Sequence, residues 1–284
     1  MSKRREIERR LHNLGEIREI MNAMKNLALM ETHKLTRLLA TQHRVADAIG
    51  CAVSEFLAFH RHLLAADEAA CDVCLLIGSE RGFCGDFNEA LLRSLEAQRW
   101  SDGDPALVVV GAKLAGRMDR DPRVVARLEG AATLEQVDGV LLKVMETLNG
   151  WRATQSPGRA LALRVFHHGA DAPGVSVTRL DPRGQRLPDA PRRGHAPLLN
   201  LEPRVFFAKL SEHYLLCALQ GIFYGSLMAE NRRRVQHMDH AVGRIDENSR
   251  SLVLERNSLR QEEITEEIEV IMLSIETARE AYPM

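Results

Sequence analysis

Apolar residues recur at alternating spacings of three and four at both ends of the chain, the pattern of a coiled-coil seam. The first seam comprises Leu14, Ile17, Met21, Met24, Ala28, Leu35, Leu38, Val45 and Ile49. The second comprises Val235, Met238, Val242, Ile245 and Leu252, then shifts phase to Ile264, Ile268, Ile271 and Ile275. A phase shift changes the supercoil locally. We expect the last isoleucines to pack mainly on the N-terminal helix; the alternative is an apolar tip that slides inside a surrounding apolar sleeve. The pattern predicts two long helices, over residues 1–60 and 203–284, that pair in antiparallel fashion.

The segment between these arms alternates short strand-like runs with helical ones. The strand-like runs are residues 73–77, 107–110, 161–166 and, as an edge strand, 175–180; the helical runs are 89–98 and 134–148. Strands separated by helices predict a small, mostly parallel sheet with helices on its faces. The predicted fold class is therefore α/β: a long antiparallel coiled coil of the N- and C-terminal helices with an inserted Rossmann-like domain over residues 70–198.

Composition and charge exclude several classes of partner. The chain carries 38 basic and 39 acidic residues, for a net charge of −1, so no global field favours nucleic acid or a membrane surface. The uncharged run 214–229 is too short for a membrane span, so we expect a helix packed on the central domain and no direct membrane insertion. Five scattered cysteines indicate free thiols in a reducing compartment. The start shows no apolar core of a signal peptide.

A glycine-rich turn over residues 78–88 is the first candidate for chemistry. It follows a predicted strand and precedes a predicted helix, where a phosphate cradle would lie. It has neither the lysine and hydroxyl of a phosphate loop nor the spacing of a dinucleotide fingerprint, which favours a tight strand-to-helix turn. The residues assigned to this structural turn are Arg81, Gly82, Cys84, Gly85 and Asn88.

Cysteines and histidines provide the remaining candidates. They are Cys71-Asp72-Val73-Cys74 with His60 and His62 upstream, the pair His167-His168, the pair His237 and His240, and Cys84. A lone CxxC at the entrance of a strand favours packed free thiols over zinc. Neither histidine pair has the third ligand and general base that metal-assisted hydrolysis requires, and the last cysteine has no neighbouring base in the sequence. We therefore expect no catalytic residue, no metal site and no cofactor.

Three segments resemble one known family. Residues 259–268 (Leu-Arg-Gln-Glu-Glu-Ile-Thr-Glu-Glu-Ile) resemble the pattern A-R-Q-A-x-I-T-x-E-[IL] of the gamma subunit of F-type ATP synthases. Residues 79–88 resemble that family's T/S-D-R-G-L-C-G-G-x-N turn, and residues 23–28 resemble its A-M-x-M-V-A stretch. The segments stand in the family's order and cover both arms and the start of the domain. The chain thus resembles a gamma subunit of a divergent bacterial branch.

The resemblance implies a rotor that is not itself an enzyme. In this family the coiled coil stands inside the ring of alpha and beta subunits, and the α/β domain forms a foot that sits with epsilon on the c-ring. Catalysis belongs to the beta subunits, and rotation of the asymmetric shaft couples ion flow to ATP synthesis or hydrolysis. The implied location is peripheral, at the cytoplasmic face of the bacterial inner membrane.

The resemblance also implies contact residues. Those aligned with the contact to a beta subunit are Arg260, Gln261, Thr265 and Arg234 on the last arm, with Met24 and Lys25 on the first. Arginine suits such a contact because its fork pairs bidentately with carboxylates, although a basic cluster such as residues 232–234 is also typical of a solvated helix face. Glu202 aligns with an E-P pair near the c-ring, and a proline in the first helical turn explains that pair equally well.

Four residues depart from the family pattern. Glu19 replaces a lysine, Met21 a threonine, Asn26 the second methionine and Asp86 the second glycine of the turn. Two other classes stay open at this stage. A static coiled-coil scaffold would not need the motif that begins at Arg260. An α/β enzyme with a coiled-coil dimerisation arm would need a nucleophile, a base or a phosphate loop at the strand ends.

Overall fold

Two long helices dominate the computed structural model, which describes residues 3–60, 71–100, 104–155, 161–170, 174–181 and 195–281. Helix α1 spans Lys3–His60 and helix α5 spans Pro203–Ala281. Contacts divide the chain into two compact units. The coil unit consists of residues 1–27 and 236–284, and the domain unit consists of residues 28–235. Both helices contribute to both units.

The coil unit is an antiparallel helical pair with a narrow seam. Met238 is fully buried in this seam and Ile245 is 8% exposed, whereas Ile17 is 43% exposed. Ion pairs flank the seam: Arg4–Glu263 at 3.3 Å, Arg18–Asp246 at 2.8 Å and Lys25–Asp239 at 3.0 Å. The partner numbers fall along α5 as they rise along α1, which confirms the predicted antiparallel pairing.

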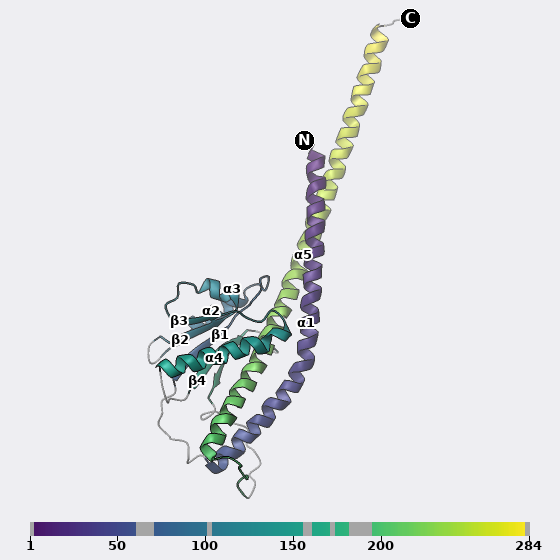
Figure 1. The fold of residues 1–284 in the computed structure, drawn as a ribbon. Coiled ribbons are helices and arrows are strands. Elements are labelled where there is room, and N and C mark those ends of the chain that lie inside the picture. The colour runs from purple at the N-terminus through teal and green to yellow at the C-terminus, as the bar shows by residue number, and fades with distance from the viewer. Residues whose placement is uncertain are drawn as a thin grey trace. The chain divides into compact units, whose positions relative to one another are not determined.

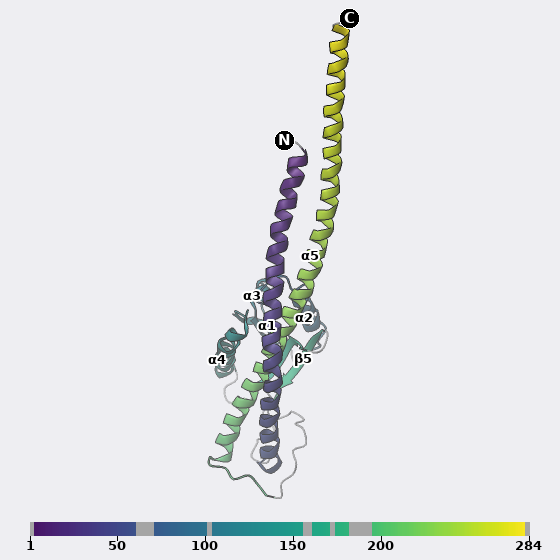
Figure 2. The same ribbon diagram turned by 90° about the vertical axis from the view of Figure 1, so that its right-hand side faces the viewer.

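The C-terminal part of α5 lies outside this seam. Figures 1 and 2 both show α5 continuing past the N-terminal end of α1. The exposed apolar residues there are Ile264, Ile268, Val270, Ile271, Met272, Leu273 and Ile275, each at least 46% exposed. The expectation that the last isoleucines pack mainly on the N-terminal helix is therefore wrong. Helix α1 begins at Lys3, and its Arg4 already pairs with Glu263, so within the described residues α1 does not cover the part of α5 that follows.

The domain unit contains a five-stranded sheet in the order β3-β2-β1-β4-β5. The strands are β1 (Cys71–Ile77), β2 (Ala106–Val110), β3 (Val124–Leu128), β4 (Leu161–His168) and β5 (Val175–Leu180). Strands β1 to β4 pair in parallel, and β5 joins β4 in antiparallel fashion. The predicted mostly parallel sheet and its edge strand are confirmed.

Within the described residues, four shorter helical elements lie between the strands. They are α2 (Phe87–Glu96), α3 (Ala112–Arg117), the 3-10 turn η2 (Leu134–Gln136) and α4 (Val137–Gln155). Sequence analysis predicted neither α3 nor β3. Helix α3 is short and contains Gly116, while β3 is an edge strand of alternating partial burial. Both signals are too brief for pattern recognition.

The sheet packs on both faces (Figure 1). Val73, Leu75 and Ile77 face a cluster formed with α4 and with the segments of α1 and α5 in this unit. Cys74 and Leu76 face a second cluster, formed with α2 and α3. Alternation along β1 thus supplies both cores, as expected for a buried parallel strand. Part of the run 214–229 belongs to the first cluster, which confirms that this segment is a helix packed on the domain.

A buried glutamine interrupts the apolar contact between α1 and α5 within the domain unit. Gln42 is 8% exposed, and its Nε2 donates to the backbone oxygen of Cys217 (3.1 Å) and to Gln220 Oε1 (3.0 Å). Gln220 Nε2 in turn donates to Asp138 Oδ1 of α4 at 3.0 Å. Val45, predicted to lie in the seam, is 45% exposed. The buried contact between α1 and α5 therefore includes Gln42 in place of Val45, because the Gln42 amide has hydrogen-bond partners on α5.

Candidate functional surfaces

The turn after β1 is held by its own side chains. Asn88 Nδ2 donates to Ser79 Oγ (2.9 Å), and the Ser79 backbone N–H donates to Asn88 Oδ1 (3.0 Å). Phe83 and Gly85 adopt the left-handed conformation, with φ of 63° and 64°. Burial raises the pKa of the Cys84 thiol, which disfavours the reactive thiolate. The geometry is that of a fixed turn.

A carboxylate of the turn binds backbone amides of two other segments of the domain. Glu80 Oε2 accepts hydrogen bonds from the backbone N–H groups of Ala112 (2.9 Å), at the start of α3, and Gly130 (2.6 Å). Gly111 has a φ of 107°, and a Cβ on it would lie 2.7 Å from the Gly78 carbonyl oxygen. Because these amides already bind Glu80, they are not presented to a nucleotide.

Arg234, one of the predicted beta-subunit contacts, lies buried in the domain unit. It forms an ion pair with Glu230, and the two residues are 5% and 3% exposed. Its Nη1 donates to Asn231 Oδ1 at 2.7 Å, and its Nε donates to the Gly82 carbonyl oxygen at 3.2 Å. Burial raises the pKa of Glu230, and the guanidinium opposes that rise. The donors of Arg234 are therefore used within the chain.

The two preceding arginines also bind the domain. Arg232 Nη1 donates to the Ala170 carbonyl oxygen, just after β4, and Arg233 Nη1 donates to Asp86 Oδ1, just before α2. The cluster is therefore not a uniformly solvated helix face. Three consecutive arginines of α5 therefore bind two segments of the domain, the turn over residues 78–88 and the segment after β4.

The other predicted contact residues belong to the coil unit. Met24 is partly buried, and Lys25 pairs with Asp239. Arg260 and Gln261 are exposed, and within the described ranges their side chains have no hydrogen bond or ion pair. Thr265 Oγ1 donates to the Gln261 carbonyl oxygen at 2.9 Å. The motif 260–265 therefore presents polar groups to solvent beside the exposed apolar end of α5.

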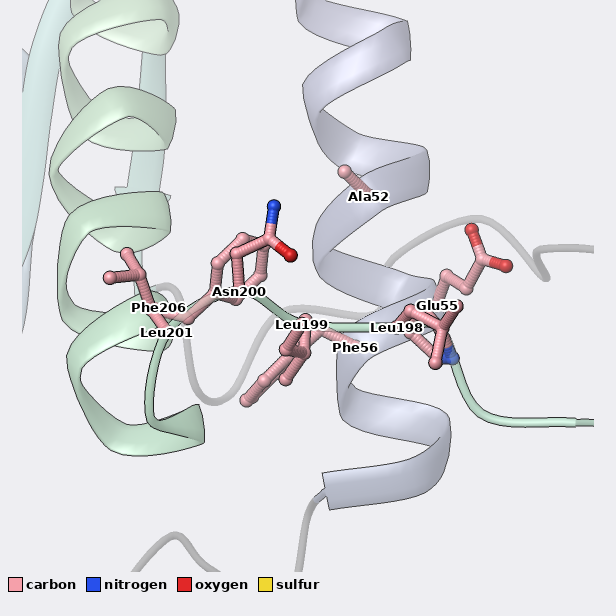
Figure 3. Close-up of a pocket in the computed structure, with 9 residues that line it drawn as sticks. Ala52, Glu55, Phe56, Leu198, Leu199, Asn200, Leu201 and Phe206 are labelled. Atoms are coloured by element: carbon pink, nitrogen blue, oxygen red, sulfur yellow. The ribbon is translucent and has the colours of Figure 1, made fainter.

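Glu202 lies at the opposite end of α5, immediately before its first residue. Its carbonyl oxygen accepts the N–H of Phe206 at 2.9 Å, so Pro203 occupies the first helical position, where its missing N–H costs nothing. Nearby, segment 198–201 crosses between α1 and α5 over a pocket of about 390 Å³ (Figure 3). The lining is mainly apolar: Ala52, Glu55, Phe56, Pro197, Leu198, Leu199, Asn200, Leu201 and Phe206.

The histidine and cysteine candidates do not converge. The ring of His167 forms a hydrogen bond with Thr178 Oγ1 (3.0 Å), and the ring of His168 forms one with the Phe87 carbonyl oxygen (2.9 Å). Both rings therefore make structural contacts within the domain. Across the part of the chain that the structure describes, no three His, Cys, Asp or Glu side chains form a metal-binding group. His62 and the Cys71 side chain lie outside that part. Among the described helices, none has the length and apolarity to cross a membrane.

These features define a class of protein: a coiled coil interrupted by a Rossmann-like domain, with exposed polar groups on its helices. The family model described as ATP synthase matches residues 3–277. The chain therefore belongs to this ATP synthase family.

Relatives and solved structures agree with that assignment. The chain is 25% identical over 305 residues to the ATP synthase gamma chain of Saccharopolyspora erythraea, with 99% of each chain covered. It is 23% identical to the ATP synthase gamma chain of Clostridium beijerinckii, with 94% of this chain and 95% of that protein covered. Its fold resembles a chain of the Euglena gracilis mitochondrial ATP synthase OSCP/F1/c-ring structure, with a TM-score of 0.68, 16% identity and coverage of 99% and 96%. A chain of the Tetrahymena thermophila central stalk and c-ring has a TM-score of 0.58 at 16% identity, with 78% of this chain and 99% of that one covered.

Sequence analysis missed the residues that attach α5 to the domain. It did not assign a role to Glu230, and it treated Asp86 only as a departure from the family pattern. A signal for the first existed, since Glu230 and Arg234 are spaced i and i+4 within an otherwise apolar helical face. No local signal connects Asp86 to Arg233, because they are far apart in the chain.

Proposed function

We propose that this chain is the central rotor shaft of an F-type ATP synthase. The observation that carries the proposal is the family match over residues 3–277, which takes in both helical arms and the inserted domain. In this role the chain couples ion flow through the c-ring to ATP synthesis or hydrolysis in the alpha and beta subunits. Neither a static scaffold nor a solitary α/β enzyme accounts for a match of that extent.

The proposed role is mechanical, with catalysis in the beta subunits. A shaft changes the affinity of a catalytic subunit only if it contacts the conformations of that subunit differently. Arg260, Gln261 and Thr265 supply directional polar groups for such contacts, with Met24 and Lys25 on the other helix. Apolar side chains from Ile264 to Ile275 supply a surface that slides without breaking directional bonds.

The remaining assignments follow from the same proposal. Arg234 contributes to the beta-subunit contact through the turn that it holds, because its own donors bind Glu230, Asn231 and Gly82. Glu202, exposed before α5, contributes to the contact with the c-ring. The chain would lie with epsilon at the cytoplasmic face of the bacterial inner membrane, attached through the complex.

Purification of a tagged chain from its source tests the function. The expected result is co-elution with alpha, beta and epsilon subunits in one size-exclusion peak, identified by mass spectrometry, with ATPase activity that requires the beta subunits. As a matched control, the same tag on an unrelated protein of similar size should recover none of them. Recovery of the chain without alpha and beta, together with turnover by the chain by itself, would contradict the proposal.

A further inference from the structure

The strand order of the sheet in the domain unit reverses between β1 and β4. From β1 the chain moves to β2 and β3 on one side, and it then crosses to β4 on the other side of β1. In open α/β sheets, ligands bind at such a switch point, beyond the carboxyl ends of the two central strands. In this chain those ends lead into Gly82 after β1 and into Ala170 after β4.

Helix α5 lies against both strand ends. A Cβ built on Gly225 would lie 3.6 Å from the Ala170 backbone nitrogen, so the helix approaches the segment after β4 closely. Arg232 donates to the Ala170 carbonyl oxygen, and Arg234 donates to the Gly82 carbonyl oxygen at 3.2 Å. Carbonyl groups at the switch point therefore bind the chain's own arginines.

Asp86 adds a third attachment at a cost to its own helix. It is the N-cap residue of α2, a position where aspartate usually accepts a backbone N–H of the first turn, yet its side chain makes no capping hydrogen bond. Its carboxylate instead binds Arg233 of α5 and Arg93 of α2, the latter at 3.1 Å. The family pattern resembled by this turn has a glycine at this position, which offers no such group.

We propose that the contacts of α5 at this switch point form a joint which transmits torque between the domain and α5, and that Asp86 is its positioning residue through Arg233. This inference rests on the proposed rotor function. Opposing torque would shear the turn along the helix, and a carboxylate–guanidinium pair resists shear directionally where apolar contacts do not. The pair is partly exposed, at 61% for Asp86 and 29% for Arg233, so it adds little to folding stability. We expect the pair to affect the coupling of ATP hydrolysis to ion transport when an opposing membrane potential resists rotation.

Two arginines on one carboxylate allow a matched test. Arg233 joins Asp86 to α5, whereas Arg93 belongs to α2 and joins Asp86 only to the domain itself. The variants Asp86→Gly, Arg233→Ala, their double mutant and the control Arg93→Ala would each be introduced into the whole ATP synthase complex. Membrane vesicles would then be assayed for membrane potential generated per ATP hydrolysed, with and without a pre-imposed opposing potential.

The expected result separates the two arginines. Under the opposing potential, Asp86→Gly and Arg233→Ala should each generate a lower membrane potential per ATP hydrolysed than wild type, and the double mutant should be no worse than either. Arg93→Ala should behave as wild type. Hydrogen exchange of the amides at 82–86 should quicken by about two- to fivefold in every variant except Arg93→Ala.

Each alternative outcome is decisive. Assembled variants that match wild type under the opposing potential would overturn the joint, and so would equal losses for Arg93→Ala and Arg233→Ala. Faster exchange without a loss of coupling would show that the pair only orders the turn, which also overturns it. Failure of the wild-type chain to assemble with alpha and beta would instead refute the proposed function.

Discussion

Helix α5 uses arginine in opposite ways in its two regions. At residues 232–234, in the domain unit, all three guanidinium groups bind other parts of the chain, and Arg234 is almost fully buried with Glu230. At residues 260–265, in the coil unit, the polar groups face solvent beside exposed isoleucines. Arginine near a helix surface is therefore no guide to its function by itself. The number of its donors already bound within the chain is the better guide.

The difference has an energetic basis. A buried guanidinium must be paired, because the desolvation cost of an uncompensated charge is large. An exposed guanidinium costs nothing to leave unpaired, so it remains available to a partner that can exclude water around it. Changes to the buried pair of Arg234 and Glu230 should therefore alter the folding of the chain, and changes at residues 260–265 should alter the working of the complex.

The largest effect is expected from breaking the buried pair. Replacement of Glu230 by alanine leaves Arg234 buried without its carboxylate and should lower the free energy of unfolding by about 3–5 kcal/mol. The measurement is urea unfolding followed by circular dichroism. Arg260→Ala is the control from the exposed region and should stay within about 0.5 kcal/mol of wild type. Equal losses in both variants would show that the two regions do not differ in the way described.

A smaller effect, seen only in the complex, is expected at the exposed site. Arg260→Ala should remove charge-assisted hydrogen bonds worth about 1.5–3 kcal/mol when they are shielded by a beta subunit. ATP hydrolysis and ATP-driven ion transport by the reconstituted complex should both fall, while assembly, checked by size-exclusion chromatography, is retained. Arg244→Ala, which removes another exposed arginine of α5, is the matched control. Wild-type rates in an assembled Arg260→Ala complex would remove this residue from the proposed contact.

The smallest effect concerns pH and the domain unit. Burial lowers the pKa of His167 from the ordinary 6.5, so the folded state keeps this ring neutral where the unfolded chain takes up a proton. Stability should be complete above pH 6.5 and fall as the pH drops from 6.5 towards the folded pKa, by at most about 1.4 kcal/mol per unit. His167→Gln should flatten this dependence in thermal melts recorded from pH 7.5 to 5.5. An unchanged slope would assign the dependence to other groups.

Periodicity predicted what repeats along the chain. The heptad pattern predicted two long antiparallel helices, and alternating strand and helix signals predicted the parallel sheet, because each signal extends over several residues of one element. Periodicity did not predict which residues of one helix are covered by another helix. Whether Ile268 and Ile271 are covered depends on where α1 lies opposite α5, which no pattern within α5 contains.

The candidate site was less predictable than the fold for the same reason. The family motif marked Arg260 and Gln261, which are exposed, and Arg234, which is buried. The i and i+4 spacing of Glu230 and Arg234 was the one local signal for the buried pair, and no local pattern connects Arg234 to Gly82, which is 152 positions away in the chain. Local patterns identify residue types suited to recognition, while tertiary contacts determine which of them are still unoccupied.

The buried amide of Gln42 limits how the lower segments of α1 and α5 can slide. Displacement by one helical turn, about 5.4 Å, would separate Gln42 from both Gln220 and the Cys217 carbonyl oxygen and leave polar groups unsatisfied in an apolar seam. Apolar seams tolerate such slippage far better than seams with one matched polar contact. The hydrogen bonds of Gln42 therefore fix the register of the two helices against a force along their axes. The substitution Gln42→Leu would remove this resistance to sliding, even if it made the protein more stable.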